Sequence, residues 1–153
     1  MNATLKDDFI ISTDPSMIDI NAVHDYLCNE SYWAKDISLQ LVQRAIAGSF
    51  CFAVFKKEDN DQLCQVGFAR VITDKATFGY LADVFILPAY RGRGLSKWLM
   101  EEITTHPDLA TLKGWMLSTR DAHGLYEQFG FNRVQSSERL MRRNTTATNA
   151  AVQ

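Results

Sequence analysis

The sequence predicts an α+β fold, with a mixed, mostly antiparallel central sheet flanked by helices. Three observations support this: two helical patterns near the N-terminus, a central run of strand-like segments joined by polar turns, and alternating strand and helix patterns in the C-terminal half. The 153 residues match the size of one domain. We therefore expect a single domain over residues 1–143, followed by a frayed polar tail over residues 144–153.

The N-terminal half begins with two expected helices. Asp14-Pro15-Ser16 is typical of a helix start, and apolar residues recur at helical spacing over residues 17–27. Residues 30–35 interrupt the pattern with two adjacent aromatic side chains. Helical spacing then resumes over residues 39–47 and ends at Gly48.

Three antiparallel strands are expected next, because apolar runs alternate with polar turns. They cover residues 49–55, 63–72 and 78–87, and Pro88 ends the third. The C-terminal half then predicts further elements in this order: a helix stopped by Pro107, a strand at 115–119, a helix at 122–129 ended by Gly130, and short strands near 131–134 and 139–142.

Composition excludes several classes of function. Sixteen basic and 18 acidic residues give a net charge of −2, so the chain has no overall attraction to nucleic acid or anionic lipid. The longest uncharged apolar run, residues 50–55, is far shorter than the roughly 20 residues of a membrane helix.

Three cysteines at unrelated spacings fit a reducing compartment. The N-terminus lacks the order of a signal peptide, and we expect a cytoplasmic protein that binds neither nucleic acid nor membrane.

The junction after the third strand predicts an anion site. In Arg91-Gly92-Arg93-Gly94-Leu95-Ser96 a helix begins, and a helix N-terminus offers unpaired N–H groups and partial positive charge to a phosphate. The two glycines leave the backbone open, and Arg91 and Arg93 add charged donors. The dinucleotide fingerprint fails because Lys97 stands where its third glycine belongs, and no P-loop sequence is present. Taken alone, the segment could also be a connection without a ligand.

Two signatures together resemble the GNAT superfamily of N-acetyltransferases. Arg91, Gly94 and Ser96 follow its Arg/Gln-x-x-Gly-x-Gly/Ala loop, with serine as a departure. The segment from Ala122 to Phe131, with Leu-Tyr-Glu-Gln-Phe-Gly-Phe at its end, is similar to the second signature. Thr119 stands where the family usually has asparagine. The resemblance covers residues 9–142.

The resemblance implies an N-acetyltransferase in which an amine attacks the thioester of acetyl-CoA directly, with no metal. A backbone N–H near Phe85 or Ile86 would bind the thioester oxygen. Tyr126 would donate to the departing thiolate, since a phenol of pKa about 10 can hydrogen-bond or protonate a thiol of pKa about 8.5. The implied cofactor contacts are Val84, Phe85, Ile86, Arg91, Gly92, Arg93, Gly94, Leu95, Ser96, Thr119 and Tyr126.

The acceptor side is less defined. Asp83 lies inside an apolar strand and could accept the amine proton, or it could equally be hydrogen-bonded to the neighbouring strand. Asp121 and His123 are weaker candidates for the base. Tyr32 and Trp33 could form one wall of the pocket for a small-molecule or peptide amine. A homodimer is left open.

Other interpretations remain. Tyr126 could be core filler on its helix face, although Gly124 suggests a close approach to that helix. His24 and Cys28 lie one helical turn apart and could form a nucleophile pair or a metal site, but a buried histidine and thiol is the simpler interpretation. A CoA-binding sensor without turnover is the alternative function.

Overall fold

The computed structural model describes residues 3–145 and contains one six-stranded sheet with strand order β1-β2-β3-β4-β5-β6. Every pairing is antiparallel except that of β5 with β6, which is parallel. This confirms the predicted fold class. The strands are β1 (Ala3–Lys6), β2 (Phe9–Ser12), β3 (Phe50–Lys57), β4 (Leu63–Thr73), β5 (Gly79–Ile86) and β6 (Trp115–Leu117).

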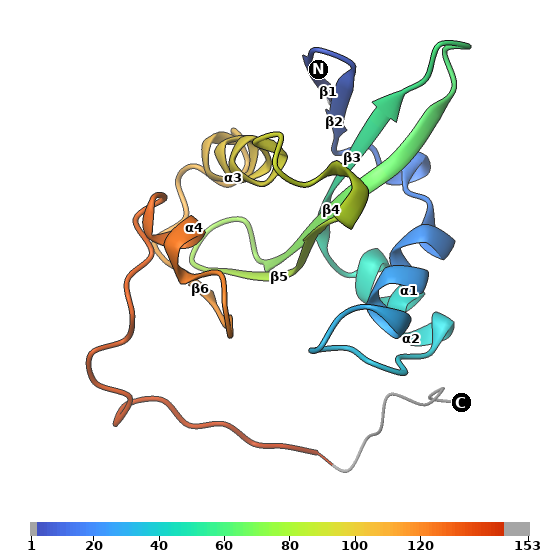
Figure 1. Ribbon diagram of the computed structural model, residues 1–153. Helices are drawn as coiled ribbons and strands as arrows, with labels where there is room; N and C mark the ends of the chain where they lie inside the picture. Colours follow the sequence, from blue (N-terminus) through green and yellow to red (C-terminus); the bar gives the residue numbers. More distant parts are fainter. Residues whose placement is uncertain (1–2, 146–153) are drawn as a thin grey trace.

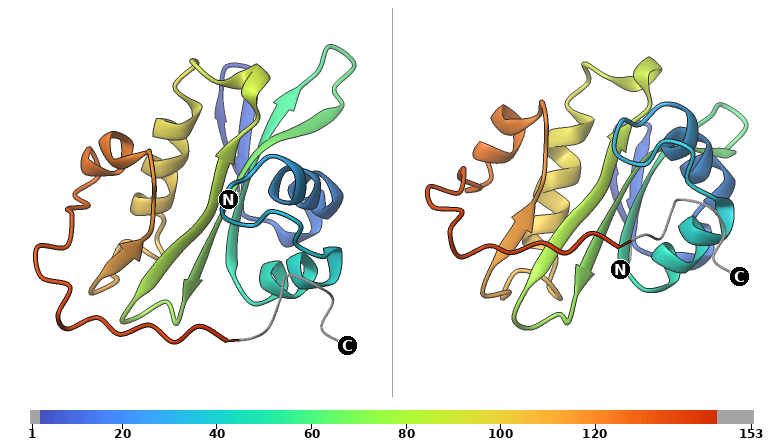
Figure 2. Two further views of the ribbon diagram at one scale, coloured as in Figure 1. Left: turned by 60° about the horizontal axis from the view of Figure 1, so that its bottom comes forward. Right: turned by 90° about the horizontal axis from the view of Figure 1, so that it is seen from below.

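Helices cover both faces of the sheet (Figure 1, Figure 2). The helices α1 (Ile20–Asn29) and α2 (Leu39–Ala47) pack on one face, and α3 (Leu95–Thr105) packs on the other, beside the short α4 (His123–Glu127). Within the described residues, none of these helices is long and apolar enough to cross a membrane.

The two faces of the sheet bury separate apolar clusters. Phe68 and Phe85 point toward α1 and α2, where they join buried residues such as Val23. On the opposite face, Val66 and Leu81 pack with the apolar stripe of α3. The sheet is therefore buried on both sides, which accounts for the continuous apolar runs that the sequence shows in its strands.

Local capping explains where the first helices begin. Asp19 accepts a hydrogen bond from the N–H of Ala22 and starts α1. The expected start at residues 14–16 is wrong: Asp14 caps only a 3-10 turn, η1 (Pro15–Met17), and α1 begins afterwards. The second helix is confirmed, with Ser38 as its N-cap and Gly48 at its C-terminal end.

The ends of the chain differ from expectation. The hairpin of β1 and β2 was not predicted, because β1 is exposed throughout and carries a single large apolar side chain, Leu5. Conversely, the strands expected near residues 131–134 and 139–142 are absent: residues 131–145 form no helix or strand. Val134, Leu140 and Met141 stay exposed there, so an apolar residue among charged neighbours does not by itself make a strand. Of the predicted tail, residues 146–153 lie outside the described residues.

A β-bulge in β5 and the separation of β5 from β6, here called the splay, shape the site. The parallel pairing of β5 with β6 ends at Leu81 and Leu117, so residues 82–86 of β5 have no strand on that side within the described chain. The register with β4 shifts at Asp83, whose φ is +52°. The bulge reverses the alternation of β5, because Leu81 packs toward α3 whereas Phe85 packs toward α1 and α2.

Candidate active site

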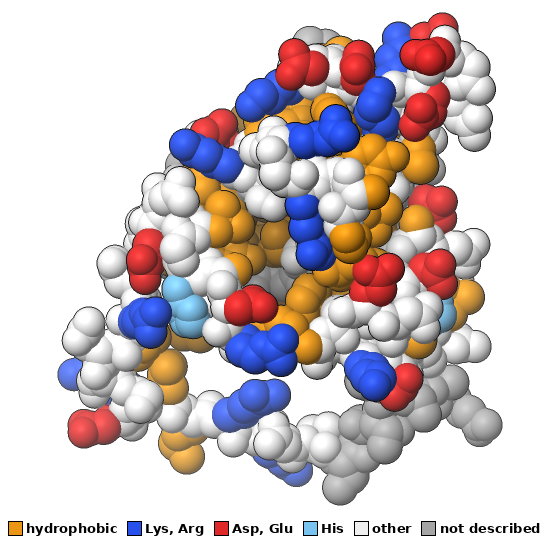
Figure 3. Space-filling view, viewed as in Figure 1, with side chains coloured by type: hydrophobic (Ala, Val, Ile, Leu, Met, Phe, Trp, Pro, Cys, Tyr) orange, Lys and Arg blue, Asp and Glu red, His pale blue; other side chains and the backbone are white. Residues whose placement is uncertain are grey.

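A cleft of about 1180 Å³ opens where β5 and β6 separate. Its walls come from β5, from the α1–α2 loop, and from the turn between β6 and α4. The space-filling view shows a hollow with apolar side chains inside and charged side chains of both signs around it (Figure 3). Asp83 and Val84 border this cleft on one side, and Thr119 and Tyr126 border it on the other.

The edge of β5 offers backbone donors to the cleft. The N–H of Leu87 donates to the carbonyl of Val66 on β4, at 2.8 Å. Because successive residues of a regular strand direct their N–H groups to opposite sides, the N–H of Ile86 faces away from β4, toward the gap. The alternation therefore selects Ile86 rather than Phe85 from the predicted pair as the donor toward the gap.

The glycine loop has the predicted strand-to-helix geometry. Gly92 and Gly94 have φ of +77° and +75°, a conformation that glycine adopts without strain. Gly94 is the N-cap of α3, and no side chain caps the helix. The first-turn N–H groups, at Leu95, Ser96 and Lys97, have no intrahelical partners and remain available to an anion.

The two arginines of the loop differ in their surroundings. The Nε of Arg91 donates to the carbonyl of Ile86 at 3.0 Å, and one Nη donates to the hydroxyl of Tyr26 at 3.0 Å. Arg91 thus ties the loop to β5 and α1 and keeps only part of its guanidinium for an anion. Arg93 is exposed and lies over the ring of Tyr90, with its guanidinium carbon 5.9 Å from the ring centroid.

Tyr126 is buried at the boundary between the cleft and a second hollow beside β6 and α4. Burial, with smaller contributions from Tyr32 and Asp121, raises the pKa of Tyr126 to about 12. Within residues 3–145 its hydroxyl has no hydrogen-bond partner, which leaves the proton free for a ligand. Thr119, in contrast, uses its hydroxyl oxygen to accept the N–H of Ala122 at 3.0 Å, at the start of α4.

Gly124 gives no indication of a close approach to α4. Gly124 is the second residue of the five-residue α4 rather than the middle of a longer helix. The cost of a glycine inside a helix therefore does not apply there.

Asp83 is engaged by two neighbours. Its Oδ2 accepts from the Nε of Arg70 at 2.5 Å, and its Oδ1 accepts from the indole N–H of Trp33 at 2.8 Å. These contacts favour the alternative of a carboxylate hydrogen-bonded to the neighbouring strand, because each oxygen already accepts one hydrogen bond. The sequence suggests only that Arg70 could reach the cleft and offers no spacing argument for its role. The signal that could have paired it with Asp83 is that each is a charged residue inside one of two neighbouring apolar strands.

The predicted acceptor residues lie on the α1–α2 loop. Tyr32 and Trp33 pack edge to face, with ring centroids 5.1 Å apart, and about two-fifths of each residue is exposed. The hydroxyl of Tyr32 accepts the backbone N–H of Arg120 at 2.9 Å, and the guanidinium of Arg120 stacks on the same ring at 3.9 Å. Both aromatic side chains border the cleft.

The alternative site at His24 and Cys28 gains no support. The Nε2 of His24 lies 2.9 Å from the carbonyl of Ile37, which requires that this nitrogen carry the proton. The histidine thus holds the α1–α2 loop. Across residues 3–145, no three His, Cys, Asp or Glu side chains gather closely enough to hold a metal ion.

Comparison with known proteins identifies the family. The family model of the acetyltransferase (GNAT) domain matches residues 48–133 of this sequence. A candidate acetyltransferase of Gibberella zeae is 30% identical over 141 residues, which covers 79% of this chain and 77% of that protein.

Solved structures agree with this comparison. The crystal structure of a GNAT-family candidate acetyltransferase from Xanthomonas campestris pv. campestris has a TM-score of 0.82 and 50% identity, over 90% of this chain and 93% of that one. A candidate acetyltransferase from Clostridium acetobutylicum, solved with acetyl-CoA, shares the fold at 12% identity and a TM-score of 0.64, over 89% of this chain and 94% of that one. The matched residues include the glycine loop, the splayed strands and Tyr126, and the chain belongs to the GNAT acetyltransferase family.

Proposed function

We propose that this protein is an N-acetyltransferase that transfers the acetyl group of acetyl-CoA directly to an amine bound in the same cleft. The observation that carries the proposal is the splay between β5 and β6. It brings backbone donors of β5 and the free hydroxyl of Tyr126 to one cleft.

The glycine loop would hold the pyrophosphate of coenzyme A. The open N-terminus of α3 supplies N–H groups at Leu95 and Ser96, and the positive φ of Gly92 and Gly94 turns the loop without side chains in the way. Arg93 is exposed and would add a positive charge beside the loop. Arg91 contributes mainly by fixing the loop, since two of its donors already bind Ile86 and Tyr26.

The chemical step needs three groups. The N–H of Ile86 would bind the oxygen that becomes negative when the amine attacks. Tyr126 would donate to the sulfur as the carbon–sulfur bond breaks, and its raised pKa keeps the hydroxyl protonated at any working pH. Thr119 would border the pantetheine arm. The amine loses its proton either to water or to a base, for which Asp83 stays a prediction.

A thiol-release assay tests the proposal. The protein is incubated with acetyl-CoA and a panel of polyamines, amino acids, aminoglycosides and peptides, and free thiol is measured against a blank without amine. We expect at least one amine to give saturable release and an N-acetylated product by mass spectrometry. Tight CoA binding without release for any amine would instead support the sensor, and an acetyl group trapped on Cys28 would refute direct attack.

A further inference from the structure

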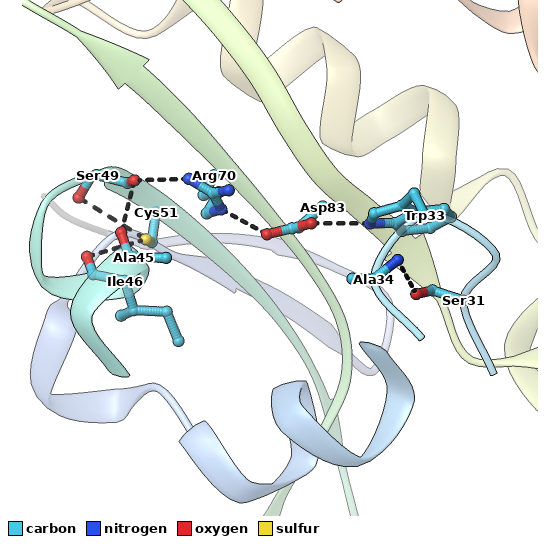
Figure 4. Close-up of polar contacts among 9 residues, drawn as sticks. All are labelled: Ser31, Trp33, Ala34, Ala45, Ile46, Ser49, Cys51, Arg70 and Asp83. Carbon is cyan, nitrogen blue, oxygen red and sulfur yellow. Dashed lines mark hydrogen bonds and ion pairs between the residues drawn. The ribbon is translucent and has the colours of Figure 1, made fainter. Parts of the chain in front are cut away.

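A chain of hydrogen bonds runs beside the cleft and connects four parts of the fold (Figure 4). Ser49, at the end of α2, donates to the carbonyl of Ala45 and accepts from an Nη of Arg70 at 3.2 Å. Arg70, on β4, donates through its Nε to Asp83 on β5. Trp33, on the α1–α2 loop, donates its indole N–H to the other oxygen of the same carboxylate. Every group in the chain acts in the role that its chemistry allows.

The ion pair at the centre of this chain is largely withdrawn from water. The side chain of Arg70 is 17% exposed and that of Asp83 is 10% exposed. Removing one partner would leave the other charge buried without compensation, which costs far more than the loss of a surface pair. Arg70 and Asp83 therefore depend on each other for their positions.

The bulge explains why Asp83 can reach both partners. Its φ of +52° is a left-handed conformation that aspartate tolerates better than most residues, but it still has to be held by surrounding contacts. The bulge directs the carboxylate toward Arg70 and Trp33, on the face where the α1–α2 loop crosses. The ion pair with Arg70 and the hydrogen bond from Trp33 help to hold this conformation.

The last member of the chain forms part of the cleft. Trp33 is bound to β5 through Asp83, while its neighbour Tyr32 is bound to the backbone of Arg120, beyond β6. The α1–α2 loop is thus attached on both sides of the splay, and its two aromatic rings face the cleft between these attachments.

We propose that Arg70 is a positioning residue of the acceptor site: it holds Asp83, and through Asp83 it fixes the indole of Trp33 as a wall against which the amine substrate binds. In this role Asp83 is a fixed hydrogen-bond acceptor and does not take the amine proton. The inference rests on the proposed function, because it concerns the substrate of the same cleft.

The first experiment follows Trp33 without any substrate. Protein labelled with 5-fluorotryptophan gives three ¹⁹F resonances, from Trp33, Trp98 and Trp115, and the variant Trp33→Phe identifies the first. We expect Arg70→Gln to shift the Trp33 resonance and leave the other two in place, and Arg70→Lys, which keeps the charge beside Asp83, to restore most of it. Lys75→Gln removes an exposed ion pair with Asp108 and is the matched control, with no shift expected.

The second experiment measures kinetics with whichever amine of the panel gives the most thiol release. We expect Arg70→Gln to raise the KM for the amine about tenfold, with kcat and the affinity for CoA changed by less than about threefold, because ground-state positioning is what it removes. In the background of Trp33→Phe, the same substitution should have little further effect on KM, since two residues that act through one contact are not additive.

Asp83→Asn separates positioning from proton transfer. Asparagine keeps an oxygen for the indole of Trp33 but cannot accept a proton as a carboxylate does. Positioning predicts a rise in KM of about the size expected for Arg70→Gln, because the ion pair is lost in both variants, and an unchanged shape of the pH–rate profile. A loss of kcat of about 100-fold or more with a lost acidic limb would overturn it. Should Arg70→Gln fail to fold because Asp83 is left unpaired, Arg70→Gln/Asp83→Asn removes both charges and carries the same two readouts.

The outcomes distinguish this inference from the proposed function. An unmoved Trp33 resonance together with an unchanged KM in Arg70→Gln refutes the positioning role, even in an active enzyme. If the wild type releases no thiol with any amine, the proposed function is refuted, and so is the role of Trp33 as a wall for the amine substrate. The ¹⁹F experiment would still report whether Arg70 controls the position of Trp33.

Discussion

Replacing Tyr126 by phenylalanine removes one hydroxyl and leaves the ring, which makes it the sharpest test of the chemistry. The pKa of about 12 means that the hydroxyl is protonated throughout the physiological range and is available as a donor to the leaving sulfur. A positioned general acid contributes about 10²–10⁴-fold. We expect the lower end, since a thiolate with a conjugate-acid pKa of about 8.5 leaves without full protonation. A 100-fold loss of kcat corresponds to about 2.7 kcal/mol of transition-state stabilisation.

Stability should change little in the same variant. The hydroxyl of Tyr126 has no hydrogen-bond partner within residues 3–145, so its removal breaks no contact of the fold, and the ring keeps its edge-to-face packing on Phe131. Thermal unfolding should therefore match the wild type, and KM for acetyl-CoA should stay within about threefold. Tyr80→Phe is the control, because Tyr80 also borders the cleft but is given no chemical role. Equal kcat in the Tyr126 variant and the wild type would show that Tyr126 only packs in the core and has no part in the chemical step.

The pH dependence adds a second check on Tyr126. A group whose folded pKa is raised keeps its proton until the pH approaches that value. The kcat of the wild type should thus show no alkaline decline from this tyrosine between pH 8 and about pH 11, whereas a tyrosine at its ordinary pKa of about 10 would begin to lose activity about two units earlier. A decline near pH 10 that disappears in Tyr126→Phe would contradict the assigned pKa shift.

Three further predictions concern other parts of the molecule. Gly94→Glu should weaken CoA binding by about 100-fold or more in calorimetry, because a carboxylate would meet the pyrophosphate at the helix N-terminus. Gly114→Ala serves as the control, and unchanged CoA affinity in Gly94→Glu would disprove the anion site. Asp74→Ala should lower the melting temperature at neutral pH, because hydrogen bonds from the β4–β5 turn hold the pKa of Asp74 below its usual value. The difference in melting temperature between this variant and the wild type should shrink as pH falls below 3.8. A difference that does not depend on pH would refute this linkage. Cys51 should be alkylated far more slowly than the exposed Cys64 at pH 8, since burial raises the pKa of Cys51 to about 12; equal rates by mass spectrometry would show that its site opens readily.

The parts of the fold that the sequence predicted well are those with local signals. The helix end at Gly48, the break at Pro88 and the glycine loop each depend on a few neighbouring residues, so their effect is visible in the sequence. β1 has no comparable signal, because it is exposed and becomes a strand only by pairing with β2. The strands expected after Phe131 had the opposite problem, since their apolar residues had no partner strand to pack beside.

The candidate site likewise contains parts that local sequence signals predict and parts that depend on distant contacts. The loop at Gly92 and Gly94 could be predicted, because positive φ and an open helix terminus are local requirements. The role of Arg91 was less visible. An arginine beside a phosphate-binding loop suggests direct contact with the anion, but its bonds to Ile86 and Tyr26 depend on how β5 and α1 meet in the fold.

Asp83 illustrates why one residue can support two mechanisms until its partners are known. A carboxylate inside an apolar strand needs either a proton or a partner, and the sequence alone allows both. The partner lies 13 positions away on β4, and the register that brings it close depends on a bulge that reverses the alternation of β5. With Arg70 on one oxygen and Trp33 on the other, the carboxylate has its partners before any substrate arrives. If Asp83→Asn leaves the pH–rate profile unchanged, the next candidate for the base is Asp121, which also borders the cleft.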